Sequence, residues 1–332
     1  MKKLILSTIA LLIILITSCD SPTEVIDDSQ PGRRDYVWTV DTIKVDASGY
    51  LTPLRIWGSS PKNIWLTCSS DRPKYNLWHY DGSWKIDAVH YLFSIYGFNE
   101  NQVWASNSNG EFWFFNGSSW NLSSKVSIEG ADFVSSNNIW GNTPNNIFSV
   151  GSREKRNVIG RIGTIIKYNG TNWTNLNIPD NPYIFLDIRS FNFTFVTAYN
   201  IDSGTKPYSL FILNDSTLTT IYEGPKPIVL SSMRDQCYFI QQSKIYKYEG
   251  SELRIWKDFS STNFIARLWG RNENDFFTYN YDGIGHFNGA DLKTIFNTNA
   301  VLRDAVIFSN DVFFIAQGAS NNTLLVIHGK LN

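Results

Sequence analysis

Histidine and cysteine are the side chains in this sequence best suited to acid–base, nucleophilic or metal chemistry. The chain holds four histidines and three cysteines. His79 and His286 each stand three residues before a turn glycine. The corresponding places elsewhere hold Phe114, Lys167, Ile212, Lys247 and Val326. A position repeated in this way is typical of scaffold, not catalysis. His90 and His328 have no carboxylate or cysteine at metal-ligand spacing, so no metal site is predicted.

Cys19 follows a segment that is typical of a secretory signal. Lys2 and Lys3 precede an unbroken apolar stretch, residues 4–16, which ends in small residues. That stretch is too short to cross the roughly 30 Å hydrocarbon core of a bilayer comfortably as a helix. Residues 1–18 are therefore interpreted as a signal peptide, and the mature chain is expected outside the cytoplasm without a membrane span.

The residues around Cys19, Ile16-Thr17-Ser18-Cys19, resemble the bacterial lipobox. The resemblance implies that lipid is attached to Cys19, which cleavage leaves as the first mature residue. An ordinary signal peptide with an incidental cysteine is the alternative. Residues 20–34 are polar and lack apolar periodicity, so 19–34 is predicted to be the lipidated cysteine and a flexible tether. The protein is expected to be lipid-anchored in the cell envelope, at an inner or an outer membrane.

Length and composition exclude several classes of function. Of the 332 residues, 42% are hydrophobic, 15% aromatic and only 18% charged, so the chain can bury a large core. A net charge of -1 does not suggest nucleic-acid binding. No nucleophile elbow, phosphate-binding loop or His-Glu-x-x-His motif is present, so no cofactor and no catalytic residue are predicted. Asp and Glu are plentiful, which leaves a glycosidase-type pair as an open alternative.

A repeat of about 40 residues organises the chain after residue 35. Its clear copies contain an aromatic–glycine pair: Trp57-Gly58, Tyr96-Gly97, Trp140-Gly141 and Trp269-Gly270. An aromatic residue in the next strand recurs at steps of 39, 44, 47, 43, 39 and 36 residues. These residues are Trp65, Trp104, Phe148, Phe195, Tyr238, Phe277 and Phe313. Seven units of this length are typical of the blades of a β-propeller.

Each unit is predicted to contain four antiparallel strands and no helix. Short runs of β-branched and aromatic residues alternate with clusters of Asn, Asp, Gly and Ser, without a 3.6-residue period. The seventh unit is interpreted as ending at a turn around Gly329, so that it lacks a fourth strand. Residues 36–45, which include Trp38, alternate like a strand and have no blade of their own. The sequence therefore predicts an all-β, seven-bladed propeller over 35–332, its last blade closed by the N-terminal strand.

The units resemble those of bacterial secreted and lipoprotein β-propellers. That family repeats Trp-Gly, then Asn-Ile-Trp, then Tyr-Asp-Gly-x-Trp, and the first unit here has Trp57-Gly58, Asn63-Ile64-Trp65 and Tyr80-Asp81-Gly82-Ser83-Trp84. The resemblance covers nearly the whole domain and implies its fold far better than its function. The family includes ligand-binding, sensory and adhesive modules, and some members carry carbohydrate-enzyme labels.

Cys68 and Cys237 remain once Cys19 is lipidated. An even number of cysteines in an exported protein favours a disulfide. These two lie in units one and five, which are not neighbours in a seven-membered ring, whereas a disulfide requires Cα atoms within about 7 Å. Both are predicted to be buried free thiols.

The first strands of a propeller line its central channel, which places one group of candidate binding residues. The channel candidates are Arg55, Asn138, Asp187, Arg189, Ser231, Arg267 and Asp304. Polar residues in such a channel also serve simply to hold buried water.

Three long loops place the second group of candidates. Connections from second to third strands share a face with the links between blades, and those at residues 69–76, 152–163 and 200–207 are enlarged. The middle loop is basic, which suits an acidic glycan or an acidic patch of an envelope protein, although an ordinary solvated loop has the same composition. The tyrosines of this group are expected to be available for stacking. The candidates are Arg72, Lys74, Tyr75, Arg153, Lys155, Arg156, Arg161, Tyr199, Lys206 and Tyr208.

The sequence thus predicts a non-enzymatic, membrane-tethered binding module for a glycan or a protein. Two alternatives stay open: a carbohydrate-active enzyme with its site at the channel mouth, and a structural component of an envelope assembly.

Lipid attachment at Cys19 is testable by metabolic labelling with a fatty acid. The wild-type protein should carry label, and Cys19→Ala should lose it because the acyl chains are bonded to, or follow from modification of, that thiol. Label that survives the substitution would rule the lipid site out.

Overall fold

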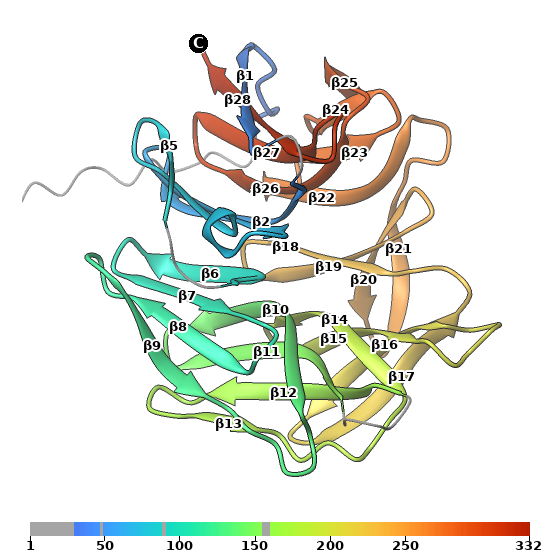
Figure 1. Cartoon of the computed structure of the whole chain (residues 1–332). Helices are drawn as coiled ribbons and strands as arrows, with labels where there is room; N and C mark the ends of the chain where they lie inside the picture. Colours follow the sequence, from blue (N-terminus) through green and yellow to red (C-terminus); the bar gives the residue numbers. More distant parts are fainter. Residues whose placement is uncertain (1–29, 47–48, 88–90, 155–159) are drawn as a thin grey trace, which may run out of the picture.

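Seven four-stranded antiparallel sheets form a ring (Figure 1). The computed structural model describes residues 30–46, 49–87, 91–154 and 160–332. The predicted signal peptide, Cys19, His90, Lys155 and Arg156 lie outside the described residues. Within these ranges the helical structure is one 3-10 turn, η1 (Pro73–Tyr75), and no helix suited to crossing a bilayer is found. The prediction of an all-β, seven-bladed propeller is confirmed.

Blades 1 to 4 take their strands in chain order, from the axis outward. Blade 1 contains β2 (Leu51–Ser60), β3 (Asn63–Ser70), β4 (Leu77–Tyr80) and β5 (Trp84–Ile86). Blade 2 contains β6 (Ser94–Asn99), β7 (Gln102–Ser106), β8 (Glu111–Phe115) and β9 (Trp120–Lys125). Blade 3 contains β10 (Phe133–Thr143), β11 (Asn146–Glu154), β12 (Ile162–Tyr168) and β13 (Trp173–Asn175). Blade 4 contains β14 (Tyr183–Ser190), β15 (Thr194–Asn200), β16 (Tyr208–Asn214) and β17 (Thr217–Gly224).

Blades 5 and 6 follow the same order, and blade 7 joins the two ends of the domain. Blade 5 contains β18 (Val229–Met233), β19 (Gln236–Gln241), β20 (Lys244–Glu249) and β21 (Glu252–Asp258). Blade 6 contains β22 (Phe264–Asn272), β23 (Asp275–Asn280), β24 (Gly283–Phe287) and β25 (Leu292–Asn297). Blade 7 contains β26 (Val301–Ile307), β27 (Asp311–Gln317), β28 (Thr323–Leu331) and, outermost, β1 (Tyr36–Lys44).

Aromatic side chains fill the space between blades. Trp120 and Trp173 begin the outer strands of blades 2 and 3, and each packs on the blade before its own. The Trp120 ring lies 5.2 Å from the fully buried Trp65, and the Trp173 ring stacks on Phe112 at 3.9 Å, measured between centroids. Since aromatic rings bury the most apolar area per residue, these contacts hold neighbouring blades together.

The ring closes through β1, as the sequence predicted. β1 pairs antiparallel with β28 along its whole length, from Tyr36 opposite Leu331 to Lys44 opposite Thr323. The turn predicted around Gly329 is wrong, because β28 continues through this glycine and pairs it with Trp38. A Cβ at position 329 would lie 2.7 Å from the Trp38 ring. Glycine is thus required here by the close approach of an indole, not by a turn.

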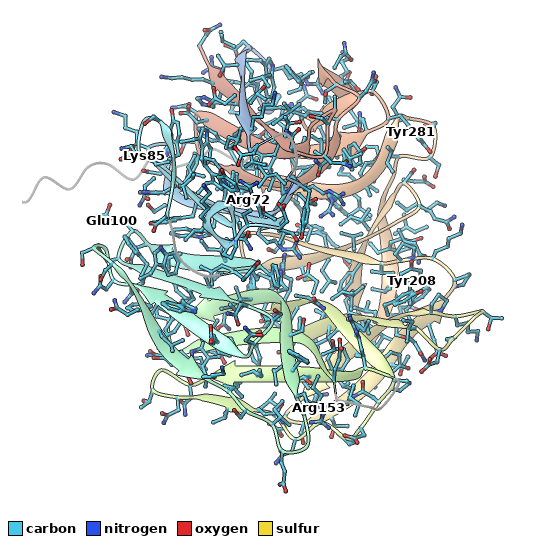
Figure 2. All side chains as sticks on the ribbon, viewed as in Figure 1. Arg72, Lys85, Glu100, Arg153, Tyr208 and Tyr281 are labelled. Carbon is cyan, nitrogen blue, oxygen red and sulfur yellow. The ribbon has the colours of Figure 1, made fainter. Side chains whose placement is uncertain are left out.

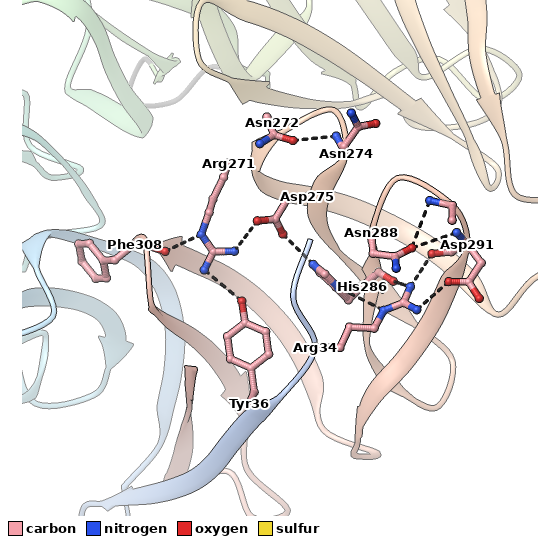
Figure 3. Close-up of polar contacts among 11 residues, drawn as sticks. Arg34, Tyr36, Arg271, Asn272, Asn274, Asp275, His286, Asn288, Asp291 and Phe308 are labelled. Atoms are coloured by element: carbon pink, nitrogen blue, oxygen red, sulfur yellow. Dashed lines mark hydrogen bonds and ion pairs between the residues drawn. The ribbon is translucent and has the colours of Figure 1, made fainter. Parts of the chain in front are cut away.

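Residues that precede β1 also belong to the folded domain. Gly32 N–H lies 3.3 Å from the carbonyl oxygens of Asn274 and Asn288, in two turns of blade 6. Arg34 donates to Asp291 Oδ1 at 2.6 Å and to the His286 carbonyl at 2.8 Å (Figure 3). Gly32 and Arg34 are thus bonded to blade 6, at the C-terminal end of the segment that the sequence predicts to be a tether.

Arg271 connects this N-terminal segment to the last blade. Its guanidinium donates to the Phe308 carbonyl at 2.7 Å and to the Tyr36 hydroxyl at 3.1 Å, and it pairs with Asp275 at 3.0 Å (Figure 3). Burial raises the pKa of Tyr36 to about 12, so this hydroxyl stays protonated at neutral pH. Blade 6, blade 7 and β1 are joined by one nearly buried cation.

The contact between Gly329 and Trp38 is testable by one methyl group. Gly329→Ala should lower the stability of the protein by about 1–3 kcal/mol, because the packed indole has to move. Gly204→Ala is the matched control: a Cβ there meets no atom within 4 Å, so a change within about 0.5 kcal/mol is expected. Thermal or urea unfolding measures both, and equal stability of the two variants would contradict the packing described.

Candidate functional site

The histidines occupy a repeated structural position. His79 stacks on Trp65 with ring centroids 3.9 Å apart, and His328 stacks on Phe313 at 4.0 Å. The Nε2 atoms of His79, His286 and His328 each lie 2.7 Å from an oxygen near the start of the second strand. The acceptors are Asn63, Asp275 and Asp311. A device repeated in three blades fits the scaffold role predicted for His79 and His286.

The two remaining thiols are free and buried. Cys68 lies in β3 of blade 1 and Cys237 in β19 of blade 5, and the structure holds no disulfide between them. Burial raises the pKa of both thiols, so neither forms a reactive thiolate at neutral pH. Within the described chain no cluster of three or more His, Cys, Asp or Glu side chains could hold a metal ion.

All seven channel candidates line a single cavity of about 290 Å³ on the propeller axis. The innermost strand of every blade contributes to its wall. Four aromatic residues from the aromatic–glycine pairs line it too: Trp57, Tyr96, Trp140 and Trp269. The sequence reading used these aromatics only as repeat markers. Their spacing from the channel candidates could have placed them in the cavity wall. Arg55 and Trp57, for example, are two residues apart on one strand and therefore point to the same face.

Bulges in the innermost strands direct polar side chains toward the axis. The strand register shifts at equivalent points of β2, β10, β14, β22 and β26. The shifts immediately precede Arg55, Asn138, Asp187 and Asp304 and span Arg267. β-bulges re-aim side chains and concentrate next to functional sites. Arg267 has a φ of 64°, a left-handed conformation that is uncommon for a residue other than glycine.

The two carboxylates of the cavity are bound by groups of the protein itself. Asp187 pairs with Arg189 and accepts from the Ile188 N–H at 2.8 Å. Asp304 accepts from the N–H of Ile56 at 3.2 Å and from Trp269 Nε1 at 3.2 Å. It therefore ties blades 7, 1 and 6 together.

The long loops lie where they were predicted, between the second and third strands of blades 1, 3 and 4. We call the surface formed by these loops and the links between blades the loop face. Figure 2 shows Tyr208 and Tyr281 of this face at the right of the view, across the molecule from Glu100, which lies in the turn between β6 and β7. The aromatic rings of Tyr199 and Tyr208 lie 5.3 Å apart, so the structure brings this predicted pair together.

Several loop-face candidates already have partners within the domain. Arg72 pairs with Asp46, and Arg161 with Glu154 at 2.6 Å. Arg153, only 15% exposed, pairs with Asp180. Lys206 lies in the loop before β16. The basic residues therefore do not form one continuous patch.

Tyr75 is not available for stacking, contrary to the expectation. It is only 8% exposed because η1 folds it into the core of blade 1, where its ring stacks with Trp78. The Lys74 ammonium covers the Tyr75 ring at 4.7 Å. A loop position alone did not reveal this burial.

The sequence reading also missed a set of apolar side chains on the loop face. They stand in links between blades, in turns from second to third strands, or at the first residue of an innermost strand. Each is an exposed large hydrophobic residue: Tyr50, Tyr91, Phe133, Ile201, Tyr281 and Val301. Tyr281, at 77% exposed, is the most exposed of the twelve such residues in the described chain. The segments that hold these residues show no apolar periodicity, so the sequence pattern gave no signal for them.

Seven four-stranded sheets around one axial cavity, with β1 completing the last sheet, define a seven-bladed β-propeller. No protein-family model and no curated protein matches the chain. Among solved structures it is similar to Ycf48 bound to a D1 peptide, at 14% identity and a TM-score of 0.61, over 91% of this chain and 99% of that one. It is also similar to Ycf48 from Cyanidioschyzon merolae, at 11% identity and a TM-score of 0.57, over 86% of this chain and 98% of that one.

A third similar structure is the extracellular domain of a proposed one-component system from B. thetaiotaomicron. It is 12% identical with a TM-score of 0.52, over 86% of this chain and 39% of that one. Identities this low show a shared fold alone.

The buried His286 predicts how stability depends on pH. Burial lowers the pKa of His286 even though Asp275 opposes the shift, so below about pH 6.5 the unfolded chain binds a proton that the folded protein does not. The melting temperature of the wild type should fall as pH drops from about 7.5 to about 5.5. The melting temperature of His286→Gln should fall less steeply over the same range. An identical slope in the variant, confirmed folded by circular dichroism, would show that His286 does not cause it.

Proposed function

We propose that this protein is a lipid-anchored binding module outside the cytoplasm, and that its ligand is another protein held on the loop face. The observation that carries the proposal is the gathering of exposed apolar side chains on that face, beside basic loops. Half of the large hydrophobic residues that stand exposed in the described chain belong to it. Binding, not catalysis, is the proposed activity.

Isolated apolar residues on a protein surface need no explanation, whereas several on one face mark a candidate interface. Tyr281 is 77% exposed, Ile201 57% and Phe133 52%. They come from blades 6, 4 and 3, so a ligand that contacts all three must span a large part of the ring. Protein interfaces combine aromatic anchors with a polar, charged rim. A protein surface fits this arrangement better than a small ligand does.

The similar solved structures are consistent with a protein ligand. One of them, Ycf48, was solved with a bound D1 peptide. Its fold is shared by this chain. The extracellular domain of a proposed one-component system from B. thetaiotaomicron has the same fold. Both likenesses support a propeller used for recognition.

The entry of the chain into the domain supports the orientation that this proposal needs. Gly32 binds the turns at Asn274 and Asn288, which join first to second and third to fourth strands of blade 6. In an antiparallel blade these turns lie at the end opposite to the loop face. A tether that runs from Cys19 to Gly32 would therefore leave the loop face pointing away from the membrane.

Site-specific cross-linking tests this function. A photo-reactive phenylalanine analogue at position 281 should form an adduct with a cellular envelope protein, because the side chain stands in the proposed interface. The same analogue at position 100, in a turn on the opposite face, is the matched control and should form none. Adducts of equal yield at both positions, or none at 281, would contradict the proposal, and an adduct with polysaccharide would favour the glycan ligand.

Substitutions of an apolar and of a basic residue then test separately the apolar and the charged contributions to binding. Ile201→Asp should reduce the adduct yield at 281 by about tenfold or more, as loss of an apolar anchor does at a protein interface. Arg161→Glu should reduce it chiefly at low salt, where the basic loop attracts an acidic partner. Leu122→Asp, at an exposed apolar site on the outer strand β9, should leave the yield unchanged.

A further inference from the structure

We propose that the axial cavity is a binding site for a small organic carboxylate, distinct from the protein interface on the loop face. The inference does not depend on the proposed function. It rests on three features of the cavity: an excess of guanidinium groups over carboxylates, polar atoms without partners, and aromatic walls around a small volume.

The charges on the cavity wall do not balance. Three arginines, Arg55, Arg189 and Arg267, line it together with two aspartates. Arg189 takes one carboxylate, Asp187, and the other is held by backbone and indole N–H groups. Arg55 donates only to backbone carbonyls, of Leu54 at 2.9 Å and of Asn137 at 3.4 Å. Arg55 and Arg267 are left without a carboxylate.

Arg267 has the least support of the three. Within the described part of the chain its guanidinium has no hydrogen bond and no ion pair. Burial is the first cause that lowers the pKa of Arg267, and repulsion from Arg55 and Arg303 adds to it, while Asp304 and Asp187 oppose it. Arginine is the side chain whose planar fork binds carboxylates through two parallel hydrogen bonds. A partly buried cation of this kind is destabilising unless an anion joins it.

Further polar atoms at the axis also lack partners. Arg189 Nε and Asn138 Oδ1 are buried, and neither has a hydrogen-bond partner in the structure. Buried polar atoms are nearly always bonded, so unbonded ones in the same cavity indicate groups that a ligand or ordered water satisfies. Both atoms are shielded from the cavity, so a ligand bonds them only when the Arg189 and Asn138 side chains move.

The size and the walls of the cavity restrict the ligand further. A volume of about 290 Å³ is at the lower end of small-molecule sites, so it admits a compact molecule and not a folded segment. Trp57, Trp140 and Trp269 supply apolar surface beside the arginines. Inorganic phosphate would use the charges and leave this surface unused. A carboxylate that carries an apolar or sugar-sized body uses both.

Isothermal titration with matched probes tests the proposal. Phenylacetate and glucuronate represent an aromatic acid and a uronic acid, phenylacetamide is the neutral analogue of the first, and inorganic phosphate is the bare anion. At least one carboxylate should bind about tenfold more tightly than phenylacetamide and phosphate, since hydrogen bonds to charged groups are worth that much. Which carboxylate binds distinguishes the two sources of the acid. Binding of neither carboxylate, or equal binding of the amide, would overturn the proposal.

Variants of the cavity arginines locate the site and distinguish a ligand-binding role from a structural role. Arg267→Gln and Arg55→Gln should each weaken carboxylate binding about tenfold or more, as removal of one charged hydrogen-bonding group does. Arg254→Gln, on the exposed outer strand β21, is the matched control and should bind normally. Without ligand, Arg267→Gln should melt at a higher temperature than the wild type, because an unpaired cation near two others is removed. Unchanged affinity in both variants, or a lower melting temperature of the ligand-free Arg267→Gln protein, would contradict a ligand-binding role.

Discussion

Ring closure between the first and the last strand is the constraint on which the rest of the structure depends. The innermost strands of all seven blades contact one cavity, and they can do so only while the ring is complete. Closure is made by backbone pairing of β1 with β28, from Tyr36 opposite Leu331 onward. Arg34 and Arg271 add hydrogen bonds that join the N-terminal segment to blade 6 and to blade 7. The two ends of the domain therefore stabilise each other, and the outer edge of β28 is paired with β1.

The polar residues of the propeller fall into two groups that differ in how well they are satisfied. Those of the repeat, such as His79 with Asn63 and His328 with Asp311, have partners within their own blade and serve the scaffold. Those at the axis are only partly satisfied, and Arg267 is held in a strained conformation without a counter-ion. Natural proteins depart from local rules mainly at functional sites, which is why the axis and not the histidines carries the ligand hypothesis.

The fold could be predicted from the sequence because it is periodic. The recurrence of the second-strand aromatic from Trp65 to Phe313 requires seven units, and the unpaired strand around Trp38 fits the incomplete last unit. The channel residues followed from topology, since alternate positions of each first strand face the axis. What could not be predicted depends on contacts between distant residues. The burial of Tyr75 by η1, the close approach of Trp38 to Gly329 and the lack of a partner for Arg267 leave no local pattern.

Hydrogen–deuterium exchange of β1 tests the closure account most directly. If the ring depends on β1, its amides bonded to β28 should exchange only when the whole domain unfolds, with the same free energy as the buried amides of β3 and β27. The amides of β1 should exchange together with those of β28. Rapid exchange of β1 while blades 1 to 6 stay protected would contradict the account, because it would show that the ring persists without its closing strand.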